Sequence, residues 1–157
     1  MNLYDGPQRE LGNGDRTGAQ ILYNEPMNTN KIALQANNGQ YVCAENGGGS
    51  NLVANRDWVL AWETFRRIDL GNNEVALQAA NGQYVCAENG GGSNLVANRD
   101  WILAWETFRR IDLGNNKVAL QAANGQYVCA ENGGGSNLVA NRDWILDWET
   151  FGIEELQ

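Results

Sequence analysis

One segment of about 43 residues occurs three times in this chain of 157 residues. Positions 31–73, 74–116 and 117–157 align without gaps until the last few residues. The first two copies differ at only four places, which are Lys31/Glu74, Ile32/Val75, Asn37/Ala80 and Val59/Ile102. Such near-identity indicates either a very recent duplication or deliberate symmetrisation, so the fold has to be assembled from three copies of one unit.

Each unit predicts four short β-strands, which in the second copy are "VALQAA" (75–80), "QYVCAE" (83–88), "LVAN" (95–98) and "WETFRRI" (105–111). "NGQ" (81–83) predicts a two-residue hairpin turn, because Asn and Gly tolerate positive φ. The glycine run "NGGGSN" (89–94) predicts a flexible loop, and "DLGNN" (112–116) a turn into the next unit.

The repeat period alone leaves three architectures to compare. A helical solenoid needs apolar residues at a spacing of 3.6, which is absent, and a propeller needs at least about four blades. We therefore expect an all-β fold of the β-trefoil type: three 43-residue, four-stranded units in a closed barrel with pseudo-threefold symmetry. Closure also removes the edge strands through which such a sheet could aggregate.

The order of "NGQYVCAE", "LVANR" and "WETF" within one period resembles the bacterial fascin-like branch of the β-trefoil superfamily, over residues 31–153. The resemblance implies a β-trefoil. That superfamily includes actin bundlers and many sugar-binding lectins, and a shared fold does not decide between them.

The first residues of the chain are different. A weak similarity to the repeat is present in "LGNGDRTGAQILYNEPM" (11–27), and a degenerate partial copy is one interpretation of this segment. We expect residues 1–30 to form a polar, poorly ordered N-terminal arm, with the trefoil occupying residues 31–157.

Charge and composition exclude several functions. The net charge of −8 repels phosphate, so we expect no nucleic-acid partner and no binding to anionic membranes. No apolar run approaches the roughly 20 residues of a membrane span. The start lacks a signal-peptide pattern, which favours a cytoplasmic protein or a fragment of a larger one.

Without histidine, the commonest general base and metal ligand is missing. We therefore expect a non-enzyme without cofactors.

Three cysteines, Cys43, Cys86 and Cys129, occupy equivalent positions. An odd number excludes a complete disulfide framework. We expect three reduced, buried thiols and no metal. The alternative is a soft trigonal metal site, if all three approach the symmetry axis.

Each copy carries two tryptophans four residues apart. The second of each pair, at Trp62, Trp105 and Trp148, is expected in the core with Phe65, Phe108 and Phe151, as the fascin-like resemblance implies. The first of each pair sits in a turn where fascin-like sequences commonly carry a small residue. It is either a lid on the base of the barrel or a platform for a ligand.

A pyranose presents a C–H face that packs on an indole, while neighbouring polar groups bind its hydroxyls. The candidate ligand-binding residues are Trp58, Asn55, Asp57, Trp101, Asn98, Asp100, Trp144, Asn141 and Asp143. Arg56 is a further local candidate, although for adjacent charges such as Arg56 and Asp57 the more frequent outcome is that they pair with each other or cap the turn. Glu45, Glu88 and Glu131 are expected to be solvated strand ends.

These observations favour a monomeric carbohydrate-binding, lectin-like protein with three equivalent shallow sites that bind glycans weakly and together give avidity. The alternative is a symmetric structural or engineered scaffold without a ligand. A third hypothesis, actin bundling by analogy with fascins, is disfavoured by the acidic net charge.

Overall fold

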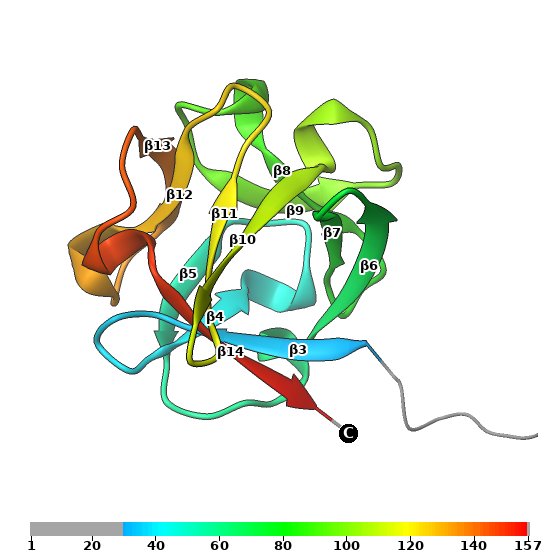
Figure 1. Ribbon diagram of the computed structural model, residues 1–157. Coiled ribbons are helices and arrows are strands. Elements are labelled where there is room, and N and C mark those ends of the chain that lie inside the picture. The colour runs from blue at the N-terminus through cyan, green and yellow to red at the C-terminus, as the bar shows by residue number, and fades with distance from the viewer. Residues whose placement is uncertain (1–29, 157) are drawn as a thin grey trace, which may run out of the picture. The chain divides into compact units, whose positions relative to one another are not determined.

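A computed structural model describes residues 30–156, which form an all-β structure without a long helix (Figure 1). The first unit contains β3 (Lys31–Gln35), β4 (Tyr41–Ala44), η1 (Glu45–Gly47), β5 (Leu52–Arg56), η2 (Ala61–Glu63) and β6 (Phe65–Gly71). The second contains β7 (Glu74–Gln78), β8 (Tyr84–Ala87), η3 (Glu88–Gly90), β9 (Leu95–Arg99), η4 (Ala104–Glu106) and β10 (Phe108–Gly114). The third contains β11 (Lys117–Gln121), β12 (Tyr127–Ala130), η5 (Glu131–Gly133), β13 (Leu138–Arg142), η6 (Asp147–Glu149) and β14 (Phe151–Leu156). Each η element is a three-residue 3₁₀ turn, and within residues 30–156 no helix has the length and apolarity to span a membrane.

The first and fourth strands of the three units close into a six-stranded antiparallel barrel. The pairings run from β3 to β6, β7, β10, β11 and β14 in turn. The circle is completed by β14, whose Gly152–Leu156 pair with Gln35–Lys31 of β3. Strands from the two ends of the described region therefore lie side by side, as Figure 1 shows in red and blue.

The second and third strands of each unit form a hairpin outside this barrel. The hairpins are β4–β5, β8–β9 and β12–β13, and they follow the same register in all three units. Single bridges join them around the circle, at Asn51–Val96, Asn94–Val139 and Val53–Asn137. The three units thus make equivalent contacts at a spacing of 43 residues.

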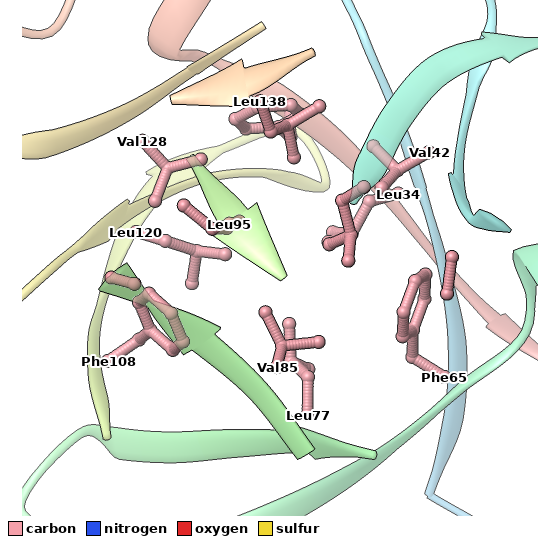
Figure 2. Packing of buried hydrophobic residues seen from close by; sticks show 14 of the residues in the cluster. Leu34, Val42, Phe65, Leu77, Val85, Leu95, Phe108, Leu120, Val128 and Leu138 are labelled. Carbon is pink, nitrogen blue, oxygen red and sulfur yellow. The ribbon is translucent and has the colours of Figure 1, made fainter. Parts of the chain in front are cut away.

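The core takes the same residues from each unit, and Figure 2 shows them converging. Its largest members are Phe65, Phe108 and Phe151, which are fully buried as predicted. Around them pack Leu34, Val42 and Leu52 with their equivalents Leu77, Val85, Leu95, Leu120, Val128 and Leu138. Buried alanines such as Ala36, Ala44 and Ala54 belong to the same cluster, so the three units share one core.

The glycine-rich loop, expected only as a flexible connection, makes specific hydrogen bonds to the next unit. It begins with the 3₁₀ turn η1 and binds the next unit, because the Asn81 N–H donates to the Gly47 carbonyl at 2.9 Å and the Gly49 N–H donates to the Ala97 carbonyl at 2.6 Å. Gly48 has φ +139°, and a Cβ there would lie 2.2 Å from the Asn81 side chain. The glycines therefore permit close contact between units.

Two element boundaries also differ from the prediction. The first hairpin of the second unit closes at Gln78–Tyr84, so its loop has five residues (79–83) rather than the two-residue turn expected at "NGQ", and the other two units close at the equivalent pairs. The fourth strand begins at Phe65 rather than at the preceding tryptophan, because residues 61–63 form η2. The predicted arm, residues 1–30, lies outside the described residues except for Asn30.

The placement of the second tryptophan in the core was wrong. Trp62, Trp105 and Trp148 remain 38–41% exposed. The 3₁₀ turn directs Glu63 inward instead, with only 4% exposure. The Trp62 indole lies against the backbone of Gly47, where a Cβ would approach its Nε1 to 3.1 Å.

This arrangement predicts an order of stability losses in the second unit. Phe108→Ala removes a fully buried ring and should cost about 3–5 kcal/mol in the free energy of unfolding. Trp105→Ala should cost less than half of that loss, because its ring is partly in water. Trp101→Ala should stay within about 0.5 kcal/mol, as for an ordinary surface change. Denaturant unfolding of the three variants gives the order, and a loss at Trp105 as large as at Phe108 would contradict it.

Candidate ligand-binding site

An open pocket lies between the third and fourth strands of every unit, and we call it the tryptophan pocket. In the first unit it has a volume of about 260 Å³ and is lined by Arg56, Trp58, Leu60, Ala61, Trp62 and Glu63. In the second unit it is lined by Arg99, Trp101, Leu103, Ala104, Trp105 and Glu106. In the third unit Arg142, Trp144, Leu146, Asp147, Trp148 and Glu149 line it, so Asp147 replaces an alanine.

Large apolar side chains of the pocket face water. Trp58 is 76% exposed and Leu60 is 70% exposed, beside the half-buried Trp62. This excludes a lid on the barrel as the role of Trp58. Exposed apolar groups that gather around a concave surface are typical of binding sites, and here the same group occurs three times.

The buried carboxylate of Glu63 holds the turn between the two indoles. Its Oε1 accepts the N–H of Leu60 at 2.8 Å, in the manner of a capping glutamate. The Thr64 hydroxyl donates to the Leu60 carbonyl at 2.8 Å. The equivalent carboxylates, Glu106 and Glu149, accept the N–H groups of Leu103 and Leu146 at 2.7 and 2.8 Å. Glu63 therefore fixes the backbone on which the pocket is built.

Arg56 lies between two carboxylates at the floor of the pocket. Its Nη2 and Nη1 donate to the two Glu45 oxygens at 3.0 and 3.4 Å, a bidentate arrangement. Its Nε lies 3.8 Å from Glu63 Oε2. Two expectations were therefore wrong: Glu45 is an ion-pair partner rather than a solvated strand end, and Arg56 pairs with Glu45 rather than with Asp57.

The cysteine of each unit belongs to the same network. Cys43 is free and fully buried, as are Cys86 and Cys129, which confirms the predicted buried thiols. Burial and a hydrogen bond to Glu63 raise the pKa of the Cys43 thiol to about 12. Within residues 30–156, no cluster of Cys, Asp and Glu is arranged to hold a metal ion. Each thiol thus contacts its own unit's carboxylate, and the trigonal metal alternative has no support.

The structure divides the predicted site residues into two groups. Trp58, Trp101 and Trp144 line the pockets. The predicted amides, Asn55, Asn98 and Asn141, are not pocket-lining residues, and each accepts a hydrogen bond from its neighbouring arginine. The predicted carboxylates, Asp57, Asp100 and Asp143, also lie outside the lining and accept from Gln40, Gln83 and Gln126 at 3.3 Å.

Sequence reasoning missed four residues that line the first pocket: Leu60, Ala61, Trp62 and Glu63. The signal was the spacing in "LAWE" (60–63), because a Glu three residues after the first residue of a turn can accept that residue's backbone N–H. The expected fourth strand included Trp62 and Glu63, and the capping role of Glu63 was therefore missed.

The carboxylate network predicts a contrast between two substitutions of Glu106. Glu106→Ala leaves the Leu103 N–H and the Arg99 guanidinium without this partner, and should cost about 1–3 kcal/mol in the free energy of unfolding. Glu106→Gln keeps an acceptor for the Leu103 N–H and should cost less. Denaturant unfolding measures both losses, and equal losses would show that the cap is not what stabilises the turn.

The thiols predict a specific alkaline instability. A thiol with a pKa of about 12 in the folded protein and near its ordinary value of 9.0 in the unfolded chain stabilises the fold fully below pH 9. That contribution is lost as pH rises from 9 to 12, because the unfolded state then releases its proton first. The triple variant Cys43→Ala, Cys86→Ala and Cys129→Ala should lose less stability over this interval than the parent. Parallel stability curves from pH 8 to pH 11 would contradict the assignment.

Comparison with solved structures places this fold among known ones. The crystal structure of the designed 3-fold symmetric protein ThreeFoil is similar at a TM-score of 0.74 and 22% identity, covering 81% of this chain and 99% of that chain. The structure of SeviL bound to asialo-GM1 saccharide is similar at a TM-score of 0.67 and 12% identity, covering 82% and 99%. At these identities the likeness concerns the fold alone.

Comparison of the sequence with curated proteins finds no match. One family model, described as Domain of unknown function (DUF7910), matches residues 24–85 and again residues 70–128. Together these two spans cover more than half of the chain and include the tryptophan pockets of the first two units. The chain therefore belongs to the DUF7910 family.

Proposed function

We propose that this protein is a non-enzymatic, lectin-like β-trefoil that binds carbohydrate in its three tryptophan pockets. The observation that carries the proposal is the exposed indole pair, Trp58 and Trp62, beside Arg56 and Glu63, repeated in every unit. The six-stranded barrel with three outer hairpins supports the β-trefoil assignment. In this proposal the main binding groups are the side chains that line the pockets, not Asn55, Asp57 and their equivalents.

The chemistry of the pocket suits a sugar ring. The C–H face of a pyranose packs on an indole, and an exposed Trp58 offers that face without rearrangement. The partly exposed Arg56 guanidinium can donate to ring hydroxyls, while the buried Glu63 carboxylate holds the turn beneath them. A shallow site with few polar groups binds weakly, and three copies compensate by avidity on a multivalent surface.

The comparisons support the same proposal. SeviL, whose fold is similar, was solved with a saccharide bound. No general base of the histidine type exists in the chain, and the pocket carboxylate is held by a backbone N–H and a thiol. These features favour binding over catalysis.

A ligand-free symmetric scaffold is the second candidate. The near-identity of the repeats and the likeness to a designed 3-fold symmetric protein favour it. It leaves unexplained why the same large apolar side chains face water in every unit, since a scaffold gains nothing from exposed indoles. Actin bundling stays disfavoured by the net charge of −8.

Removing the exposed indole of each pocket, which is the platform for the sugar ring, tests the proposal. The triple variant Trp58→Ala, Trp101→Ala and Trp144→Ala should keep its unfolding midpoint within a few degrees and should lose glycan binding on a glycan array. Single variants should reduce avidity stepwise, because the pockets act independently. A matched control, Leu70→Ala with Leu113→Ala, removes exposed apolar residues outside the pockets and should bind like the parent.

Two results would overturn the proposal. One is that the parent binds no glycan at millimolar concentration, which favours the scaffold. The other is that the triple variant is folded and binds glycans as tightly as the parent, which moves the site elsewhere on the protein.

A further inference from the structure

A second groove adjoins the tryptophan pocket of the first unit. It has a volume of about 460 Å³ and is lined by Lys31, Ala61, Thr64, Arg66, Gln78, Ala79, Ala80 and Gly82. Ala61 lines both this groove and the tryptophan pocket, so the two hollows lie on either side of η2. A ligand that is bound on the indoles and extends past Ala61 therefore reaches the groove.

The groove carries positive charge on an otherwise acidic protein. Lys31 on β3 and Arg66 on β6 are directly opposite in the strand register, and Gln78 on β7 is opposite Arg66 on the other side. Lys31 and Arg66 are exposed, and no carboxylate belongs to the lining. Both side chains carry N–H donors and a positive charge, which is the chemistry that binds a carboxylate.

The other two units do not repeat this charge pair. In the second unit, Glu74 takes the place of Lys31 and is opposite Arg109. In the third, Lys117 is opposite Gly152, which replaces the arginine. The third tryptophan pocket also contains Asp147, where the first two have alanine. Three of the substitutions that change charge, at Lys31/Glu74, at Asp147 and at Gly152, thus lie in a tryptophan pocket or at positions equivalent to this groove.

We infer that the three sites differ in ligand: the first binds a saccharide that carries a carboxylate, such as a hexuronic acid, and the other two bind neutral saccharides. The inference rests on the proposed function. Trp58 and Trp62 hold one sugar ring, and Lys31 with Arg66 bind the carboxylate of that ring or of the next one. Charge-assisted hydrogen bonds from arginine and lysine are the ordinary means of binding a carboxylate.

Variants that keep one platform each isolate the three sites. Trp101→Ala with Trp144→Ala leaves the first, Trp58→Ala with Trp144→Ala the second, and Trp58→Ala with Trp101→Ala the third. The probes are oligosaccharide pairs that differ only in a terminal hexose or its uronic acid, namely glucose against glucuronic acid and galactose against galacturonic acid. Tryptophan fluorescence titration measures each affinity, with sodium acetate as a control for the carboxylate alone.

The first site should bind the acidic member about three- to tenfold more tightly than the neutral one at low salt, and the preference should shrink as salt screens it. The second and third sites should prefer the neutral member. Acetate should not displace the sugar at millimolar concentration. Displacement by acetate would show an anion site unconnected with the sugar and would overturn the inference.

The repeat supplies matched swaps. Lys31→Glu gives the first unit the residue of the second, and Glu74→Lys does the reverse, so the acidic preference should disappear from the first site and arise at the second. Arg66→Gly copies the third unit and should weaken the preference as well. If neutral sugars bind at all sites but the swaps leave the acidic preference unchanged, the inference fails while the proposed function stands. If neither probe binds at any site, both fail.

Discussion

Closure of the barrel is the constraint on which the rest of the structure depends. A single unit has two barrel strands and one hairpin, and its Phe65, Leu34 and Val42 are buried only when the other two units surround them. The pairing of β14 with β3 completes the circle, and the glycine-rich loops bind each unit to the next. Because the apolar core is supplied by strands and hairpins, the segment between the third and fourth strands is released from core packing.

That released segment forms the candidate site. Its only deeply buried side chain is the carboxylate of Glu63, which is stabilised by the Leu60 N–H, the Cys43 thiol and the nearby Arg56. Burying a carboxylate is costly unless it is paired and hydrogen-bonded, and this network supplies both conditions. With the turn anchored by a polar group, both indoles remain at the surface.

The sequence predicts the barrel well because the repeat, the strand patterns and the buried Phe65 all point to one architecture. It predicts the site only in part. Hydrophobicity places Trp62 inside and Glu63 outside, whereas the structure leaves Trp62 partly exposed and buries Glu63. A 3₁₀ turn interrupts the strand period there, and the partners of Glu63 come from distant positions such as Cys43. The contacts of the glycine loop were likewise not predicted, because its hydrogen-bond partner Asn81 belongs to the next unit.

All six tryptophans of the chain belong to the three pockets, so the indole N–H signals of a ¹H–¹⁵N NMR spectrum report on the candidate sites alone. Addition of a glycan that the protein binds should move both signals of a pair together, because the ring packs on Trp58 beside Trp62. Backbone signals of the barrel core should stay in place. Binding that leaves all six indole signals unmoved would contradict the central claim that the paired tryptophans are the saccharide site.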